Sequence, residues 1–357
     1  NKLIDENDRV VYEYKNLKDQ IVLKVAEGEG DNLKTYYVYD DFDRLRYVIP
    51  PKAAKQAGTS ILQGDDLFRE LVYYYEYDNY GRKKLKKLPG AEPIFMVYDE
   101  RDRQVLTQDG NMREHNEWQF TKYDALNREV MTGVLTCANN IDPAAMQDKF
   151  NDFTGRTPGE LYEEAVFSND QGYTLNQSFP AGVNISASDI HTIIYYDTYD
   201  YIERFNYDFA PPQEISMNER LLYPQGMVTG SQTRILGTDE FLVTVKYYDT
   251  KGRLIQQHKE NHLGGMDVIS NEYDFSGNLL TSKRVHTLRE TPPLELWKFF
   301  HYDHADRLIR KEHQIGNNPA NRVVLADMEY NERGEVITKK LHSPVGQSEF
   351  LQKIDYK

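Results

Sequence analysis

The chain has 357 residues, and its 57 acidic and 43 basic side chains give a formal net charge of −14. This charge argues against nucleic acid as a partner, because binding to phosphates requires a basic surface. No apolar run approaches the ~18 residues of a membrane span, and the single cysteine, Cys137, excludes an internal disulfide.

The first part of the chain alternates short strands with two helical insertions. A degenerate repeat near Tyr14 and a better one at Tyr39 precede Pro50-Pro51, which end the strand composition. KAAKQA at 52–57 and DDLFREL at 65–71 are typical of short helices. Three closely spaced repeats then fill residues 72–135.

The middle of the chain departs from this pattern, and the last part returns to it. Asp142-Pro143 begins a helix that we expect through residue 150, since Pro is favoured in a first helical turn. A second short helix is expected at 158–164, and residues 172–188 resemble a loop. The sequence therefore predicts three regions: repeats over 1–137 with an insertion at 50–72, a partly helical insertion over 138–193, and repeats over 194–357.

One motif recurs throughout: Tyr-Asp-x-x-(Gly/Asp/Asn)-Arg-apolar. It begins at Tyr39, Tyr77, Tyr98, Tyr123, Tyr196, Tyr248, Tyr273, Tyr302 and Tyr330. The steps 98 to 123 and 248 to 273 are both 25 residues, and a fixed period of this size indicates a repeat architecture. Aromatic and β-branched residues flank each motif, as in strands. A lone hairpin is marginally stable, so the repeats are expected to stack edge to edge.

The motif has the composition of a hairpin turn. An Asp that begins a turn can bond to its own backbone two residues on, and a left-handed residue after a type I turn is a common hairpin loop. The slot four residues after the tyrosine holds Asp43, Gly81, Asp102, Asn127, Asp200, Gly252, Gly277, Asp306 and Gly334. Gly, Asn and Asp tolerate positive φ best, so positive φ is expected at the four glycines and at most of Asp43, Asp102, Asn127 and Asp306.

The structural repeat positions follow from this interpretation. They are Tyr39, Asp40, Arg44, Tyr77, Asp78, Gly81, Arg82, Tyr98, Asp99, Arg103, Tyr123, Asp124, Arg128, Tyr248, Asp249, Gly252, Arg253, Tyr273, Asp274, Gly277, Tyr302, Asp303, Arg307, Tyr330 and Gly334. The Asp and Arg of one motif are expected to form a cross-turn contact of ~0–1 kcal/mol. The tyrosines share one phase relative to the turn, so we expect them on one side of the sheet, each packed on the neighbouring hairpin.

The motif resembles the YD repeat of the Rhs family, and longer stretches are similar to the large Rhs/YD-repeat proteins of Bacteroides-type bacteria. The resemblance covers most of the chain and is carried by VYDDFDRLRYVIPP (38–51), LPGAEPIFMVYDERDRQVLTQDG (88–110), FTKYDALNREVMTG (120–133), TGSQTRILG (229–237) and NHLGGMDVISNEYDFSG (261–277). It implies a mainly β fold, with antiparallel hairpins stacked into a ribbon that spirals into a hollow shell.

The resemblance also implies a function. Such shells enclose a toxic C-terminal domain or display repeats at the cell surface, which implies an extracellular or cell-surface location. The family's cargo-releasing core carries paired Asp-Pro motifs, whereas this chain has Asp142-Pro143 alone. We therefore expect neither a self-cleaving site nor a toxin domain in this sequence, and we interpret it as a piece of a longer protein.

Chemistry-bearing patterns are weak, so we expect no catalytic, cofactor or metal residues. His301 and His304 are three apart, which places them on opposite faces of a strand. His258, His262 and Asp267 show no ligand spacing. EGEGD at 27–31 is read as a hairpin tip rather than a calcium loop, KKLKK at 83–87 as a solvated edge strand, and Cys137 as a buried inert thiol.

Three functions remain open. The first is a non-catalytic structural segment that scaffolds or encloses a C-terminal effector region, with the rest of its own chain as partner. The second is a glycan- or protein-binding module of a surface adhesin, because 27 tyrosines could stack sugar rings. Exposed Tyr or Trp gathered in one groove would favour binding, and an even spread would favour the shell. The third, a hydrolase, needs two convergent carboxylates.

Overall fold

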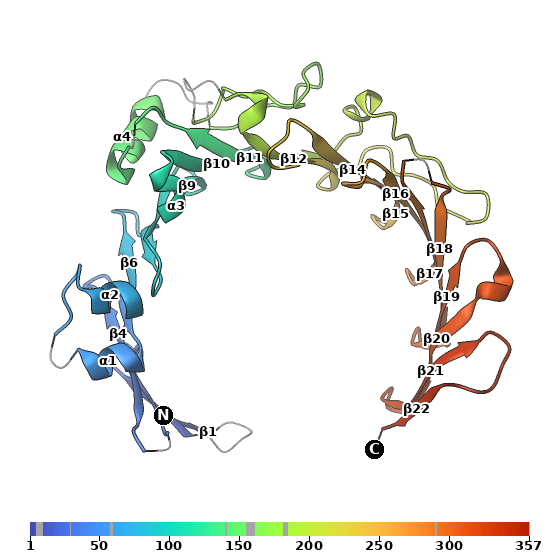
Figure 1. Ribbon diagram of the computed structural model, residues 1–357, viewed down its shortest axis with the longest axis horizontal. Helices are drawn as coiled ribbons and strands as arrows, with labels where there is room; N and C mark the ends of the chain where they lie inside the picture. The colour runs from blue at the N-terminus through green and yellow to red at the C-terminus, as the bar shows by residue number, and fades with distance from the viewer. Residues whose placement is uncertain are drawn as a thin grey trace. The chain divides into compact units, whose positions relative to one another are not determined.

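The computed structural model describes residues 1–4, 10–28, 30–57, 60–139, 141–154, 161–180, 185–289 and 291–356. The chain forms two compact units. The first comprises Asn1–Glu164 and Leu175–Asp189, and the second comprises Ala165–Thr174 and Ile190–Lys357. Antiparallel strands dominate both units, so the chain is mainly β, as the motif predicts (Figure 1).

The first unit is a meander in which each strand pairs antiparallel with the next along the chain. Its strands are β1 (Lys2–Ile4), β2 (Val10–Lys15), β3 (Ile21–Ala26), β4 (Leu33–Tyr39), β5 (Leu45–Ile49), β6 (Tyr73–Tyr77), β7 (Lys83–Lys87), β8 (Ile94–Tyr98), β9 (Gln104–Gln108), β10 (Glu117–Tyr123) and β11 (Glu129–Thr136). Each motif joins two of these strands, which confirms that the repeated unit is a hairpin.

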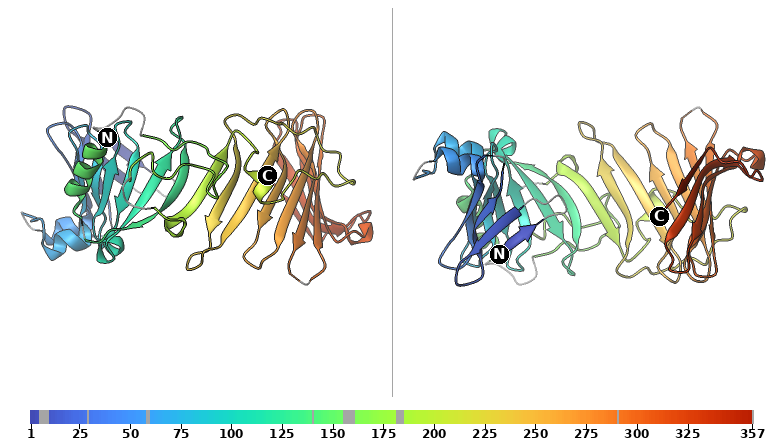
Figure 2. Two further views of the ribbon diagram at one scale, coloured as in Figure 1. Left: turned by 90° about the horizontal axis from the view of Figure 1, so that it is seen from above. Right: turned by 90° about the horizontal axis from the view of Figure 1, so that it is seen from below.

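The second unit follows the same rule with longer strands. Its strands are β12 (Ile190–Tyr196), β13 (Val228–Arg234), β14 (Phe241–Tyr248), β15 (Leu254–Glu260), β16 (Met266–Tyr273), β17 (Leu279–Thr287), β18 (Leu294–Tyr302), β19 (Leu308–Ile315), β20 (Val323–Tyr330), β21 (Val336–Pro344) and β22 (Gln352–Asp355). Figure 2 shows consecutive strands side by side within each unit.

Three of the expected helices are present. They are α1 (Pro51–Gln56), α2 (Asp66–Leu71) and α4 (Pro143–Thr154). The helix expected at 158–164 is wrong where it can be described: residues 161–164 form a turn and irregular backbone, and residues 158–160 lie outside the described residues. The sequence analysis missed α3 (Gly110–Glu114), which Asp109 caps by accepting a bond from the Met112 amide at 2.9 Å. Three-residue 3-10 turns occur at Ala187–Asp189, Ile202–Arg204 and Pro319–Asn321.

The helical insertion of the first unit packs on one face of the sheet. Ala53, Phe68 and Val72 are buried with Tyr74, and Tyr47 packs against them. Burying side chains of the size of Phe68 and Val72 stabilises the fold by about 1.5–3 kcal/mol each. Within β4, Val38 lines a pocket together with residues of the insertion and so lies on the covered face. By the period of two, Tyr39 points to the opposite face.

In the second unit, the segment 198–227 is the insertion that packs on one face of the sheet. The ring of Tyr201 stacks on that of Tyr195 at 4.0 Å, and the hydroxyl of Tyr247 donates to the carbonyl of Tyr207 at 2.6 Å. Gly230 permits this covering, since a Cβ there would lie 2.2 Å from the Tyr201 hydroxyl oxygen. Tyr247 therefore faces the insertion, and its neighbour Tyr248 faces the other side of the sheet.

The lysine-rich strand β7 differs from the sequence-based expectation. The lysine-rich strand β7 pairs with both β6 and β8, so its interpretation as an edge strand is wrong. Lys87 is buried, and its ammonium donates to the carbonyls of Val72 at 3.2 Å and Leu88 at 3.1 Å. Among the described residues, no helix is both long enough and apolar enough to cross a membrane.

Candidate functional site: the clasps between hairpins

The hairpin turns have the predicted geometry. Asp40 illustrates it: its carbonyl accepts from the Asp43 amide at 3.0 Å, and its amide donates to the Arg44 carbonyl at 2.9 Å. Asp43 has φ 65°, so a type I turn is followed by a left-handed residue. Positive φ is confirmed at Asp43, Gly81, Asp102, Asn127, Gly252, Gly277, Asp306 and Gly334.

Two repeats differ from their sequence interpretation. In the repeat at Tyr196, Asp197 has the positive φ of 68° and Asp200 does not, because residues 198–227 interrupt the hairpin. In the first repeat the tyrosine position is held by Lys15 rather than Tyr14. Lys15 pairs with Ile21 as Tyr39 pairs with Leu45. This shift by one residue follows from the turn bonds, which run from Asn16 to Gln20.

The motif aspartate fixes the turn. One oxygen of Asp40, Oδ1, accepts from the amides of Phe42 at 3.0 Å and Arg44 at 2.9 Å, and Oδ2 accepts from Arg44 Nε at 2.8 Å. The same three bonds recur at Asp78, Asp99, Asp124, Asp249 and Asp303. The expected cross-turn pair is therefore present, and the carboxylate additionally satisfies two backbone donors that a turn leaves without a ladder partner.

The motif tyrosine reaches back to the preceding hairpin. The hydroxyl of Tyr77 donates to the carbonyl of Leu45 at 2.9 Å, and Leu45 is the first residue of the strand after the previous turn. The same bond links Tyr39 to Ile21 (3.1 Å), Tyr98 to Lys83 (2.9 Å), Tyr123 to Gln104 (2.8 Å), Tyr248 to Val228 (2.8 Å), Tyr273 to Leu254 (3.0 Å), Tyr302 to Leu279 (3.2 Å) and Tyr330 to Leu308 (2.8 Å). This recurrence confirms that each of these tyrosines packs on the neighbouring hairpin.

The motif arginine reaches forward to the next hairpin. Arg44 Nη1 donates to the carbonyl of Asp78 at 3.2 Å, and its guanidinium lies 5.0 Å from the centre of the Tyr77 ring. Equivalent pairs of contacts join Arg82 to Asp99 and Tyr98, Arg253 to Asp274 and Tyr273, and Arg307 to Asn331 and Tyr330. A cation over an aromatic ring contributes ~0.5–2 kcal/mol. We call the backward tyrosine bond and the forward arginine contact together the inter-hairpin clasp.

Three repeats place other residues at the motif positions. Gln20 occupies the arginine position of the first repeat and donates to the Asp43 carbonyl at 3.2 Å. Asn278 replaces arginine, bonding to Asp274 at 2.9 Å and to Asp306 of the next turn at 2.8 Å. In the last repeat Asn331 donates to Glu335 at 2.7 Å, which reverses the donor and acceptor of the usual pair.

Burial and hydrogen bonding perturb the acidity of clasp residues. The side chain and amide of Arg307 hold the pKa of Asp303 down to about 2. Burial pushes the pKa of Asp249 upward, yet the bonds from Arg253 and Asn218 outweigh it and leave the pKa lowered. Burial raises the pKa of Tyr123 to about 12. In each case the folded state favours the protonation form that makes the clasp.

Candidate residues outside the clasps have partners of their own. His258 Nε2 lies 3.0 Å from Gln256, and Asp267 pairs with Arg284 at 2.9 Å and with His286 at 2.7 Å. His301 lies 3.6 Å from Glu312. Among the described residues no three His, Cys, Asp or Glu side chains gather as a metal site.

Cys137 and the acidic segment 27–31 are the remaining candidates. Cys137 is half-buried, and burial raises the pKa of its thiol, which suits an inert cysteine. In the segment 27–31, the Glu27 carboxylate accepts from Tyr12 at 3.1 Å and Asp31 pairs with Lys55 at 2.7 Å. Glu29 lies outside the described residues.

Comparisons with known proteins give structural matches alone. No protein-family model matches the chain, and no curated protein matches its sequence. The crystal structure of TcdB2-TccC3-Cdc42 matches at 16% identity and a TM-score of 0.39, over 93% of this chain and 15% of that chain. The crystal structure of TcdB2-TccC3 matches at 16% identity and 0.39, over 93% and 16%. A structure of the Photorhabdus luminescens Tc holotoxin pore matches at 15% identity and 0.39, over 93% and 15%.

The chain thus spans about 15% of the length of the structures that it matches. At this identity and TM-score the likeness supports no argument about activity or partners. The functional interpretation rests on the repeat motif and on the clasps.

Proposed function

We propose that this chain is a structural segment of a longer Rhs-type protein. In this proposal its stacked hairpins form a wall that scaffolds or encloses a C-terminal effector region, and the segment is non-catalytic by itself. The observation that carries the proposal is the use of the repeated Asp, Arg and Tyr. These chemistry-bearing side chains bond to each other and to the backbone of neighbouring hairpins.

The clasps suit a wall because they act between hairpins. A strand ladder alone joins neighbouring hairpins through backbone bonds, and edge strands can slip in register. A tyrosine that bonds to one particular carbonyl, and an arginine that bonds to another, select a single register. A sheet of this kind can extend by repetition, with stability that sums over neighbours.

The proposed partners and location follow from the sequence resemblance. The partner is the rest of the longer chain, including neighbouring repeats and an effector region, and the location is extracellular or at the cell surface. The net charge of −14 gives no support to a nucleic-acid partner.

A glycan- or protein-binding module ranks second. Both tryptophans, Trp118 and Trp297, are buried. The tyrosines that are more than half exposed lie on separate elements: Tyr14 in β2, Tyr80 at a turn tip and Tyr223 in the insertion of the second unit. Stacking of sugar rings along a groove needs several exposed rings together, which these positions do not supply.

Limited proteolysis of the natural full-length protein tests the proposal. The region C-terminal to the repeats should resist protease while the clasps are intact. It should become sensitive in a variant carrying Tyr77→Phe, Tyr98→Phe and Arg82→Lys. The matched control carries Tyr80→Phe and Arg333→Lys at exposed turn tips and should stay resistant. If protease cleaved the C-terminal region of the wild-type protein as readily as that of the clasp variant, enclosure would be contradicted.

Assays of the purified chain test the non-catalytic part of the proposal. Glycosidase, peptidase and nuclease substrates, together with metal analysis, should give neither turnover nor a stoichiometric metal. Turnover that one Asp, Glu or His substitution abolishes would overturn it.

A further inference from the structure

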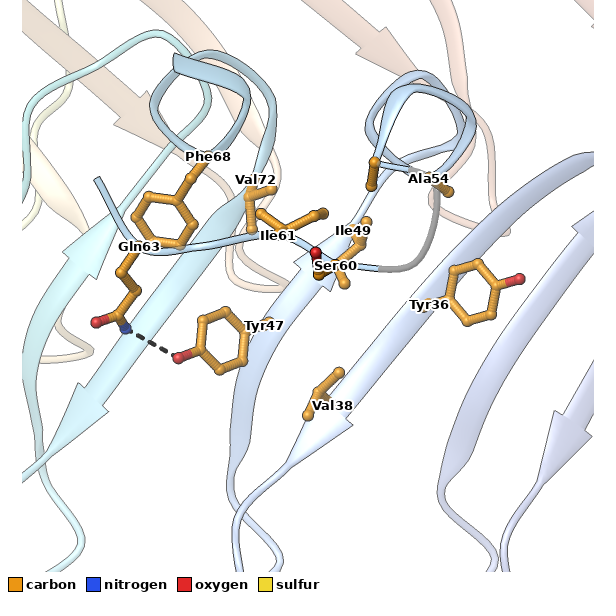
Figure 3. A pocket seen from close by; sticks show the side chains of 11 residues that line it. Tyr36, Val38, Tyr47, Ile49, Ala54, Ser60, Ile61, Gln63, Phe68 and Val72 are labelled. Carbon is orange, nitrogen blue, oxygen red and sulfur yellow. Dashed lines mark hydrogen bonds between the residues drawn. The ribbon is translucent and has the colours of Figure 1, made fainter. Parts of the chain in front are cut away.

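A pocket opens on the face of the first unit that carries the helical insertion. Its floor is made by Tyr36 and Val38 of β4 with Tyr47 and Ile49 of β5 (Figure 3). The wall comes from described residues in and around α1 and α2, namely Ala54, Ala57, Ser60, Ile61, Gln63, Phe68 and Val72. The cavity volume of about 450 Å³ falls within the usual range for small-molecule sites.

The lining is unusual for this chain because it carries no charge. Acidic and basic residues make up 28% of the sequence, and the net charge is −14. None of the eleven lining residues is Asp, Glu, Lys or Arg. An ion placed in such a lining would lose its hydration without gaining a partner, so the pocket disfavours charged ligands.

One end of the pocket holds a hydrogen-bonded pair of polar side chains. Gln63 Nε2 donates to the hydroxyl of Tyr47 at 2.9 Å, as the dashed line in Figure 3 marks. The Tyr47 hydroxyl accepts this bond and retains its own hydrogen for donation, and Gln63 retains an amide oxygen that can accept. These groups can orient a ligand that carries one oxygen or one amine.

Aromatic rings pack against one another on one side of the pocket. Tyr47 stacks on Tyr74 with centroids 4.9 Å apart, and Phe68 meets Tyr47 edge-on at 6.4 Å. In contrast, Tyr36 and Val38 are 37% and 41% exposed. The pocket therefore has a side of mutually packed aromatic rings and a more open side at Tyr36 and Val38, which leaves apolar surface in water until something covers it.

We propose that this pocket binds a neutral, mainly apolar small molecule that carries one hydrogen-bonding group. The site is separate from the clasps, because Val38 and Tyr39 point to opposite faces of β4. The scaffold function does not depend on it. Binding would bury the exposed parts of Tyr36 and Val38 and join the α1–α2 insertion more firmly to the sheet.

Two fluorescent probes with the same ring system test the charge argument. N-phenylnaphthylamine is neutral and has a single amine, whereas anilinonaphthalene sulfonate adds a sulfonate. Titration of the full chain should give saturable binding of the neutral probe at one site. The anionic probe should bind at least about tenfold more weakly. Equal affinity for both probes, or no saturable binding, would overturn the proposal.

Matched variants place the binding in this pocket. Val38→Glu puts a charge on its floor, and Ile337→Glu does the same on β21 at a similar exposure of 39%. The first should weaken binding of the neutral probe by about tenfold or more, and the second should leave it unchanged. Ala54→Phe fills the cavity without a charge and should also abolish binding. This second variant keeps the test valid if Val38→Glu fails to fold. Unchanged binding in a folded Ala54→Phe would overturn the assignment.

Hydrogen exchange and size-exclusion chromatography complete the test. The neutral probe should slow exchange in α1 and α2 and not in α4. If the wild-type chain forms a concentration-dependent dimer and Val38→Glu is monomeric, a second copy occupies the pocket. This result would overturn the small-molecule proposal.

Discussion

The hydroxyl of Tyr77 donates to the backbone carbonyl of Leu45 at 2.9 Å, and this bond joins two hairpins that are separate in the sequence. From the opposite direction, Arg44 places its guanidinium 5.0 Å from the Tyr77 ring centre and bonds to the carbonyl of Asp78. One tyrosine is therefore held between the backbone behind it and the arginine beneath its ring. Repetition of this arrangement explains why the motif retains Tyr and Arg on either side of turn tips that vary freely.

Removing one clasp hydroxyl should lower stability. Tyr77→Phe leaves the Leu45 carbonyl without its partner in a partly buried position, and we expect a loss of about 1–2 kcal/mol in the free energy of unfolding. Tyr80→Phe in the same hairpin is the control, because Tyr80 is 83% exposed and its hydroxyl makes none of the clasp bonds. Urea denaturation measures both, and an equal effect of the two changes would count against the clasp.

The left-handed slot should discriminate by backbone conformation. Gly81 has φ 84°, and a Cβ added there would meet nothing within 4 Å. Any effect of substitution is therefore due to φ. We expect Gly81→Val to lose about 1–2 kcal/mol or more, because a β-branched residue resists positive φ. Gly81→Asn should stay near wild type, since Asn127 occupies the same slot at φ 65°. Equal denaturation midpoints for Gly81→Val and Gly81→Asn would contradict the turn assignment.

A buried ion pair anchors the middle of the first unit. Lys122 donates to Glu163 at 2.6 Å with both side chains fully buried, and it also donates to the carbonyls of Leu175 and Ser178. Lys122→Met or Glu163→Gln alone should lower the free energy of unfolding by about 3–5 kcal/mol, because each leaves a buried charge without its counter-charge.

The double variant Lys122→Met/Glu163→Gln measures the energetic coupling between the two side chains. Its loss should be smaller than the sum of the single losses, since no uncompensated charge remains. Proteolysis should also show that either single change exposes residues 173–180. Strict additivity of the two losses would show that the charges act independently.

Buried and half-buried tyrosines predict that the fold loses stability at high pH. Burial raises the pKa of Tyr98 and Tyr248, and it raises that of Tyr123 to about 12. An unfolded tyrosine has a pKa near ~10, so neutral tyrosine stabilises the fold fully below about pH 10, and this contribution is lost as the pH rises through the folded pKa.

We therefore expect the free energy of unfolding to fall between about pH 10 and about pH 12. The fall should be smaller in Tyr123→Phe, which removes one of the titrating groups. Urea denaturation across this range, with tyrosinate absorbance recorded alongside, checks the prediction. The same slope in Tyr123→Phe as in the wild type would contradict it.

The turns could be predicted from the sequence because a turn is local. The slot four residues after each tyrosine admits Gly, Asn and Asp alone, and positive φ is found where the slot is part of a short hairpin. The insertion helix over Pro51–Gln56 was equally accessible, since proline and alanines mark it within a few residues. The α3 helix was missed because its signal is one capping residue, Asp109, before a five-residue turn.

The clasps and the pocket could not be predicted, because they join residues that only the stacking of hairpins brings together. The arginine looked like one half of a weak cross-turn pair, and its contact with the next tyrosine depends on the register between hairpins. Likewise, the Lys122–Glu163 pair spans 41 residues and depends on how a loop returns to the sheet. The constancy of Tyr and Arg beside variable tip residues was the available signal for the clasp.

The coupling between Arg253 and Tyr273 tests the clasp most directly. The two residues belong to different hairpins, and the guanidinium carbon of Arg253 lies 4.9 Å from the centre of the Tyr273 ring. A double-mutant cycle with Arg253→Met and Tyr273→Leu, followed by urea denaturation, measures it. We predict a coupling of about 0.5–2 kcal/mol, whereas the cycle of Arg253→Met with the distant Tyr330→Leu should be additive to within about 0.5 kcal/mol. If the Arg253–Tyr273 cycle is as additive as the distant one, the hairpins are held by their backbone ladder alone and the clasp has no role.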